Sequence, residues 1–225
     1  MPTRLLIIRH GQTDWSVGDR FTGSSNINLN DVGRAQARAL AQRLDGMQLF
    51  IKDDTLADPH VLLGDDPKRI AAVYSSPLDR SQETARIVAE PFGLPVKVVP
   101  ELRELDYGAW EGLRREEILA QYPKEFDLWS RDPALYAPPG GESGLTLVAR
   151  VRPAIDQIVA AHPNETVLVA AHKTVNRLLI CSLFNIPLKN YRWVIWQNVA
   201  CLNIINFVSS DAVSLIKLND TCHYE

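Results

Sequence analysis

The sequence predicts an α/β fold in three layers: a mostly parallel sheet with helices on both faces, and an antiparallel edge hairpin near the C-terminus. Three observations predict it. Short apolar runs alternate with stretches of helical periodicity, which is typical of parallel sheets. The runs are continuous, as in strands buried on both faces. Ala200–Phe207 and Ala212–Leu218 flank a polar turn at Ser209-Ser210-Asp211. We find no internal repeat, so we expect residues 1–225 to form one domain.

The N-terminal part supplies two strands and the helix between them. Leu5–Ile8 is a short run of branched apolar residues, which predicts a buried strand. Asn30 is a suitable N-cap for a helix that ends at Gly46. Ile70–Tyr74 predicts the second strand. The stripe of this helix that we expect to face the core comprises Val32, Ala35, Ala39, Leu40 and Leu44.

The middle of the chain continues the alternation of strand and helix. Ser76 and Pro77 predict a helix with the serine as its cap and the proline in its first turn. This helix should stop near Pro91, and Val96–Val99 predicts a third strand.

The C-terminal part begins with the longest helical pattern. Glu142-Ser143 begins this helix and His162-Pro163-Asn164 ends it. Thr166–Ala171 then predicts another buried strand, and Thr174–Phe184 another helix. The apolar stripe of the long helix comprises Leu147, Val151, Ile155 and Ile158.

Two segments depart from the alternation. Residues 46–69 form an acidic excursion, for which a dimer contact, a lid or disorder would each be an explanation. Residues 122–141 contain four prolines, two tyrosines and Trp129, which indicates a long, lid-like loop. The aromatic residues there either shape a lid over a ligand or pack the segment onto the domain.

Composition narrows the possible partners. The formal net charge of −3 gives no electrostatic footprint for nucleic acid. The apolar runs are too short to span a bilayer, and the N-terminus lacks the pattern of a signal peptide. The three scattered cysteines indicate reduced thiols, so we expect a cytoplasmic protein. A regulatory disulfide and a homodimer remain open.

Polar residues lie where the predicted strands end. Arg9 and His10 follow the first strand, and His172 follows Thr166–Ala171. Arg80 lies one turn into the helix after the second strand, and Glu104 follows the third. Because ligands bind at the carboxyl ends of parallel strands, we expect these five side chains to meet in one pocket.

These residue types together suit phosphate chemistry. The arginines are planar, bidentate donors for phosphate oxygens, and nearby cations keep a histidine neutral and nucleophilic. Each residue alone has a structural interpretation, and His60, His162 and His223 receive only that one. The two histidines with Glu104 are also possible metal ligands, but no HxH or HExxH spacing supports a metal site. We therefore expect no metal and no cofactor.

The motifs around these residues resemble the signature of the histidine phosphatase superfamily, the phosphoglycerate-mutase-like proteins. The blocks occur in order over nearly the whole chain. They are Arg9-His10-Gly11-Gln12-Thr13, Arg20-Phe21-Thr22-Gly23, Ser75 to Ala85, Leu102 to Gly112, Gly140-Gly141-Glu142-Ser143 and His172.

The resemblance implies a metal-free, two-step mechanism. His10 would attack phosphorus and become a phosphohistidine, while Arg9, Arg80 and His172 would hold the phosphoryl group. Glu104 would protonate the leaving group and then activate water. The substrate or phosphate contacts that we expect from the resemblance and from the lid-like segment are Gln12, Thr22, Gly23, Tyr107 and Arg131.

The sequence also departs from the family pattern at two places. Ser16 follows Trp15 where an asparagine often helps to bind phosphate in the family, so that contact is either weaker here or supplied by Gln12. Lys173 follows His172 where many members have glycine, and it could either contact phosphate or point away.

The resemblance leaves three functions to weigh. The segments Trp129 to Pro133 and Leu218 to His223 resemble the phosphatase branch, which predicts a phosphomonoesterase that acts on a small phosphorylated metabolite. Arg114 and Arg115 keep a cofactor-dependent phosphoglycerate mutase as the alternative, since a mutase must hold a second anionic group. A non-catalytic binding or regulatory module is the third, and the five retained catalytic residues count against it.

Overall fold

A computed structural model describes residues 2–46, 70–208 and 212–224 of this chain, so most of the acidic excursion and the turn at Ser209-Ser210-Asp211 lie outside the described residues. Its strands are β1 (Thr3–Arg9), β2 (Ile70–Ser75), β3 (Val96–Val98), β4 (Thr166–Ala171), β5 (Leu202–Phe207) and β6 (Val213–Asp220). Its α-helices are α1 (Asp14–Val17), α2 (Asp31–Gly46), α3 (Asp79–Ala89), α4 (Arg115–Gln121), α5 (Pro123–Arg131), α6 (Gly144–Ala160), α7 (Lys173–Leu183) and α8 (Tyr191–Val194). Short 3₁₀ turns are η4 (Glu90–Phe92), η5 (Pro100–Leu102), η6 (Gly108–Trp110) and η7 (Leu188–Asn190).

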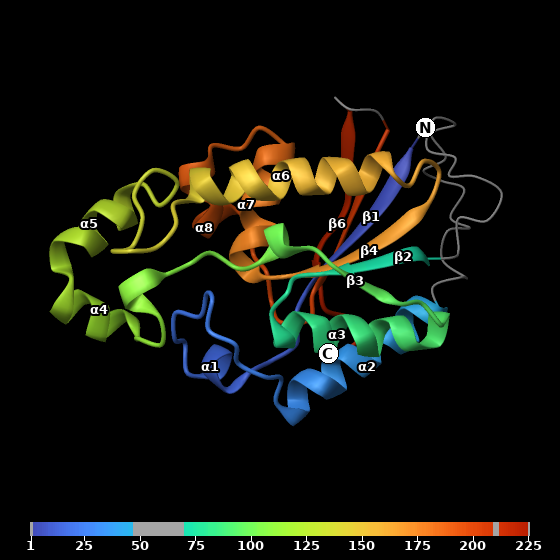
Figure 1. The fold of residues 1–225 in the computed structure, drawn as a ribbon, viewed down its shortest axis with the longest axis horizontal. Coiled ribbons are helices and arrows are strands. Elements are labelled where there is room, and N and C mark those ends of the chain that lie inside the picture. The colour runs from blue at the N-terminus through green and yellow to red at the C-terminus, as the bar shows by residue number, and fades with distance from the viewer. Residues whose placement is uncertain (1, 47–69, 209–211, 225) are drawn as a thin grey trace.

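The six strands form one sheet in the order β3-β2-β4-β1-β5-β6 (Figure 1). The first four strands in this order are mutually parallel. β5 runs antiparallel to β1, and β6 pairs antiparallel with β5 at the edge. The predicted α/β fold with an edge hairpin near the C-terminus is therefore confirmed.

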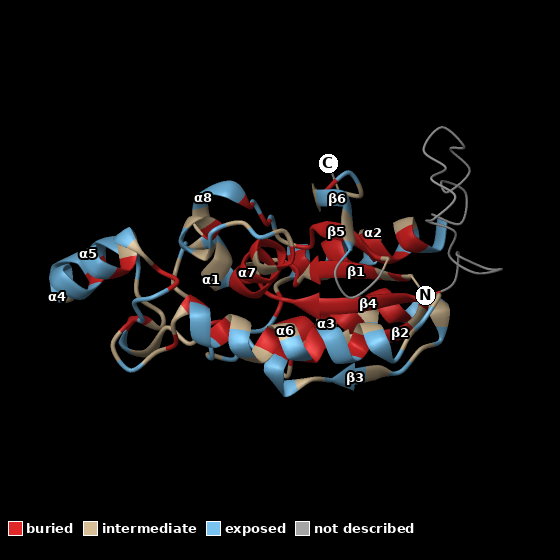
Figure 2. Ribbon diagram, turned by 90° about the horizontal axis from the view of Figure 1, so that it is seen from above, coloured by how far each residue is buried: buried red, intermediate tan, exposed pale blue. Residues whose placement is uncertain are grey.

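Helices cover both faces of the sheet, with α6 and α7 on one side and α2 and α3 on the other (Figure 1). Alternate residues of β1 serve the two cores: Leu5 and Ile7 pack with α6 and α7, while Leu6 and Ile8 pack with α2 and α3. This alternation follows from the two-residue period of a strand. Figure 2 shows the resulting band of buried strands between the helical layers.

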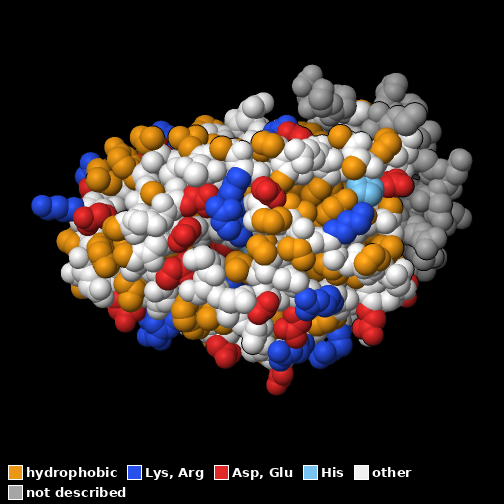
Figure 3. Space-filling model, in the orientation of Figure 1, with side chains coloured by type: hydrophobic (Ala, Val, Ile, Leu, Met, Phe, Trp, Pro, Cys, Tyr) orange, Lys and Arg blue, Asp and Glu red, His pale blue; other side chains and the backbone are white. Residues whose placement is uncertain are grey.

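The outer surface has mixed charge. Figure 3 shows basic and acidic side chains intermixed on one face of the molecule, in keeping with the small net charge of −3. None of the helices in the described ranges is long and apolar enough to cross a membrane.

The buried stripe of α2 differs from the predicted one. Val32 and Ala35 are exposed, and the residues that face the core are Gly33, Gln36, Ala37, Leu40, Ala41 and Leu44. Gly33 lies so close to the loop after β1 that a Cβ there would be 2.2 Å from the carbonyl oxygen of Gln12. The periodicity counted only apolar residues, so it missed a face that begins with glycine and glutamine. The predicted N-cap is confirmed, since Asn30 Oδ1 accepts the Gly33 N–H at 2.9 Å.

The predicted start of α3 was also wrong. α3 begins at Asp79 after Leu78 and has no side-chain cap. The hydroxyl of Ser76 makes other contacts: it accepts the N–H of Leu78 at 3.3 Å instead of capping the helix. It lies 2.6 Å from Nε2 of His172.

The predicted loop at residues 122–141 contains a helix, α5, over nearly half of its length. α4 and α5 project from one end of the sheet (Figure 1). They pack through a separate apolar cluster of Trp110, Ile118, Phe126 and Trp129. Trp129 is 2% exposed, so it packs this segment together, as one of the two sequence interpretations had it.

Candidate active site

Strand register brings the predicted residues together. Arg9 pairs with Ala171 across the parallel strands β1 and β4, so His10 and His172 are the next residues on neighbouring strands. Their ring centroids lie 5.3 Å apart. Both side chains are buried, at 6% and 0% exposure. The register therefore brings the two histidines together at the carboxyl edge of the sheet, where Arg9, His10 and Glu104 line a pocket and His172 and Arg80 are buried outside its lining.

The ring of His10 is held in one protonation state. Its Nδ1 lies 2.8 Å from the carbonyl oxygen of Gly11, which can only accept a hydrogen bond, so Nδ1 carries the proton and Nε2 carries the lone pair. Burial lowers the pKa of His10 well below its ordinary value, and the guanidinium groups of Arg80 and Arg9 lower it further. The ring is therefore neutral near pH 7, with Nε2 available as a nucleophile.

The free nitrogen of His172, Nδ1, carries a proton, whereas the free nitrogen of His10, Nε2, carries a lone pair. Ser76 Oγ accepts the N–H of Leu78 at 3.3 Å, and within the described ranges its hydroxyl has no acceptor other than His172 Nε2. The hydroxyl therefore donates to Nε2, and the ring proton lies on Nδ1. That Nδ1 is buried with no hydrogen-bond partner in the described part of the chain. Burial lowers the pKa of His172, as do Arg80 and His10, so this ring is also neutral.

Two buried arginines accompany the histidines. Arg80 is 0% exposed and donates from Nη1 to the Ser25 carbonyl at 2.7 Å and from Nη2 to the Gly23 carbonyl at 2.8 Å. Arg9 donates from Nη1 to the Gln197 carbonyl at 2.8 Å. The Nε–H of each arginine is buried with no partner among the residues described. Burial lowers the pKa of Arg80 to about 10, which leaves it charged at pH 7.

Gly23 has a structural reason to be glycine. A Cβ at this position would lie 2.1 Å from the carbonyl oxygen of Leu105 and 2.3 Å from a carboxylate oxygen of Glu111. Glycine is therefore needed here for close packing against Leu105 and Glu111, and the expected contact of Gly23 with a ligand stays a prediction. Glu111 also accepts hydrogen bonds from Ser24 and Ser25. It thereby fixes the turn whose carbonyls hold Arg80.

Glu104 lies at the N-terminus of α7. Its Oε1 accepts the N–H of Leu105 at 2.8 Å and of Val175 at 3.3 Å, and its Oε2 accepts the N–H of Thr174 at 3.0 Å. Helix N-termini favour negative charge, and three donors fix both oxygens. Glu104 is 4% exposed and lines the same pocket as His10.

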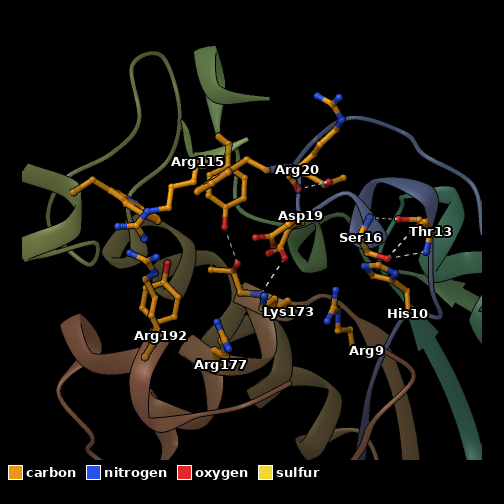
Figure 4. A pocket seen from close by; sticks show the side chains of 17 residues that line it. Arg9, His10, Thr13, Ser16, Asp19, Arg20, Arg115, Lys173, Arg177 and Arg192 are labelled. Atoms are coloured by element: carbon orange, nitrogen blue, oxygen red, sulfur yellow. Dashed lines mark hydrogen bonds between the residues drawn. The ribbon is translucent and has the colours of Figure 1, made fainter. Parts of the chain in front are cut away.

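The pocket has a volume of about 290 Å³. Figure 4 shows side chains from the loop after β1, from α7 and from α8 converging on it. The cations that line it are Arg9, Arg20, Arg115, Lys173, Arg177 and Arg192, and the carboxylates are Asp19 and Glu104. This excess of positive charge suits a ligand with more than one negative charge.

The expected substrate contacts divide into two groups. Thr22 and Tyr107 line the pocket, and the Tyr107 hydroxyl lies 3.1 Å from Thr174 Oγ1. Gln12 is instead tied to α2: its N–H donates to Gln36 and its side-chain oxygen accepts from Asn30. Arg131 is 73% exposed, pairs with Asp127 at 2.8 Å, and lies outside the pocket lining.

Sequence reasoning missed two of the six cations that line the pocket, Arg177 and Arg192. Arg177 is the one charged residue in the sequence of α7 after Lys173, four positions later, and this spacing places the two side chains on one face. A lone arginine in an apolar helix was therefore a usable signal. Arg192 lies in a short irregular segment, and no pattern in the sequence marks it.

Comparisons with known proteins agree with this geometry. Residues 5–51 and 64–221 match the model of the histidine phosphatase superfamily (branch 1). Phosphoserine phosphatase 1 of Hydrogenobacter thermophilus is 30% identical over 220 residues, which cover 98% of this chain and 93% of that protein. The metal-independent phosphoserine phosphatase of Arabidopsis thaliana is 30% identical over 224 residues, 92% of this chain and 86% of that one. A solved structure of a mycobacterial glucosyl-3-phosphoglycerate phosphatase with VO3 has a TM-score of 0.78 and 31% identity, covering 96% of this chain and 98% of that one.

Proposed function

This chain belongs to branch 1 of the histidine phosphatase superfamily, and from that premise we propose that it hydrolyses a small phosphate monoester through a phosphohistidine at His10, without a metal ion. One observation carries the proposal. The neutral ring of His10 has a free Nε2, and the residues around it hold three buried N–H groups without acceptors in the described part of the chain. Phosphatase names among the relatives support it.

In the first step, His10 Nε2 attacks phosphorus. The N–P bond forms as the bond from phosphorus to the ester oxygen breaks, and that oxygen takes a proton from the carboxyl of Glu104. The unsatisfied donors are Arg9 Nε, Arg80 Nε and His172 Nδ1. They would donate to the phosphoryl oxygens, where they stabilise charge that develops in the transition state.

In the second step, water replaces the histidine. The carboxylate of Glu104 takes a proton from water, the water oxygen attacks phosphorus and the N–P bond breaks. His10 Nε2 regains its lone pair and inorganic phosphate leaves. The division of one difficult displacement into two easier ones is the general gain of covalent catalysis.

The same site offers no obvious route for a large substrate. A cavity of about 290 Å³ suits a metabolite rather than a phosphoprotein surface.

Cys181 and Cys201 are buried, Cys222 is exposed, and none forms a disulfide. Free thiols support a cytoplasmic location as part of the proposal.

The test is a panel of metabolite phosphates assayed for release of inorganic phosphate, with and without a metal chelator. We expect turnover that ignores the chelator and is lost in His10→Ala. Activity that disappears with chelator would contradict the metal-free mechanism. The panel includes 3-phosphoglycerate with 2,3-bisphosphoglycerate, since isomerisation without net phosphate release would instead identify a mutase.

A further inference from the structure

One motif of the sequence has no role in the proposed mechanism. Gly140-Gly141-Glu142-Ser143 lies directly before α6, and Glu142 is buried outside the pocket lining. A buried carboxylate is costly unless it is paired. Its partner is Arg150 of α6, whose Nε and Nη2 donate to the two carboxylate oxygens at 2.8 and 2.6 Å. This is the bidentate geometry of a strong ion pair.

The other N–H groups of Arg150 all bind one stretch of backbone. Nη1 donates to the carbonyl oxygens of Glu101 and Arg103, the latter at 2.9 Å, and Nη2 donates to that of Glu104 at 3.1 Å. With the two bonds to Glu142, these use all five N–H groups of the guanidinium. Within the described ranges, no other hydrogen bond involves these three carbonyls. Arg150 therefore ties α6 to the segment that carries Glu104.

The motif itself makes a second connection to this segment. The N–H of Glu142 donates to the carbonyl oxygen of Asp106 at 2.8 Å. A Cβ on Gly141 would lie 2.5 Å from the same oxygen, so the approach requires glycine. Figure 1 shows the chain after β3 passing alongside α6 on its way to α4. The backbone around Glu104 is therefore held both by α6 and by the loop before it.

We propose that Arg150 and Glu142 are positioning residues for Glu104, which keep its carboxyl group directed at the leaving oxygen and then at the attacking water. The inference rests on the proposed function, in which Glu104 acts first as an acid and then as a base. The carboxylate of Glu104 accepts three backbone N–H groups, but its protonated form carries an O–H donor and has less capacity to accept. The bond from Arg150 goes to the main-chain carbonyl, so it persists in both protonation states. The Arg150–Glu142 pair is therefore the hold on Glu104 that remains when the carboxyl is ready to give its proton.

The experiment removes the pair and compares two leaving groups. Misplacement of a catalytic group by about 1 Å can cost about 100-fold in rate, and the acid role of Glu104 matters only where the leaving oxygen needs a proton. We expect Arg150→Met to reduce kcat/KM roughly 10- to 100-fold on an alkyl phosphate and less than about threefold on p-nitrophenyl phosphate. Inhibition by inorganic phosphate should be nearly unchanged, because Arg9 and Arg80 are held by other parts of the chain.

A second variant keeps the test valid if Arg150→Met fails to fold. Arg150→Met leaves the carboxylate of Glu142 buried without its bidentate partner, which is strongly destabilising, whereas Arg150→Met combined with Glu142→Leu removes both charges. This double variant should fold and show the same selective loss on the alkyl phosphate. Arg152→Gln is the matched control, since Arg152 lies on the same helix and pairs with Asp156 at 2.8 Å but is 30% exposed. It should change neither rate.

The Glu104→Gln variant separates this inference from the proposed function. In that background Arg150→Met should not lower the ratio of alkyl to aryl rates further, because the acid that it positions is already lost. Equal losses on the two substrates in the folded double variant, an unchanged ratio, or weaker inhibition by phosphate in step with the loss of rate would overturn the inference. No turnover of either substrate by the wild-type protein would overturn the proposed function instead.

Discussion

Replacement of Glu104 by glutamine separates its chemical role from its structural one. The variant keeps the shape of the side chain but cannot give a proton to the leaving group. General acid catalysis contributes roughly 10²- to 10⁴-fold, and it matters most when the leaving oxygen is basic. We expect Glu104→Gln to lose about that factor on an alkyl phosphate but less than about tenfold on p-nitrophenyl phosphate, whose leaving group needs no proton.

The stability of the same variant follows from its hydrogen bonds. A glutamine oxygen can keep the bonds from Leu105 and Val175 but must lose the one from the Thr174 N–H, now at 3.0 Å from Oε2. A hydrogen bond to a charged group contributes about 1.5–3 kcal/mol, so the free energy of unfolding should fall by about that amount. Urea denaturation measures it, with the exposed Glu101→Gln as control. Equal kinetic losses on the alkyl and aryl substrates would refute the role of Glu104 as acid and leave it a structural cap of α7.

Three further predictions test other parts of the site. The pKa values of His10 and His172 are both lowered, so these rings stay neutral in the folded protein while the unfolded chain gains protons on them below about pH 6.5. Below that pH the free energy of unfolding should fall by up to about 1.4 kcal/mol per pH unit for each ring. Urea titrations that show no loss of stability on acidification would contradict this. Gly23→Ala should displace the carbonyl that holds Arg80 and reduce kcat about tenfold or more. The control is Gly46→Ala, where a Cβ would meet no atom of the described residues within 4 Å, and normal activity of Gly23→Ala would show that the turn tolerates the shift. Arg131→Ala should leave kcat/KM within about twofold because the side chain is largely exposed and paired with Asp127, and a large loss would place it in the substrate site after all.

The positions of His10 and His172 could be predicted because each depends only on which residue directly follows a strand. Each apolar run in the sequence delivers the residue that follows it to one edge of the sheet. The sequence alone therefore places His10 and His172 side by side, and strand register confirms it. The orientation of each ring was not predictable, because it depends on the Gly11 carbonyl and on Ser76, whose role as a helix cap was predicted wrongly.

The outer part of the pocket depends on packing between distant segments. Arg192 enters because α8 packs against α5 through Trp129, a contact that no local pattern encodes. The expectation for Arg131 came from its place in a segment interpreted as a lid, but its turn of α5 directs it to solvent. The rotation of a helix about its axis thus decides which of its residues can meet the ligand. This rotation was the weakest part of the sequence prediction, as the buried face of α2 also shows.

The stereochemical course at phosphorus is the sharpest test of a covalent phosphohistidine. Hydrolysis of a phosphate monoester made chiral with oxygen isotopes distinguishes one displacement at phosphorus from two. A phosphohistidine at His10 requires two in-line displacements, each with inversion. We therefore predict net retention of configuration in the inorganic phosphate released. Net inversion would mean direct attack by water, and would contradict His10 as the nucleophile.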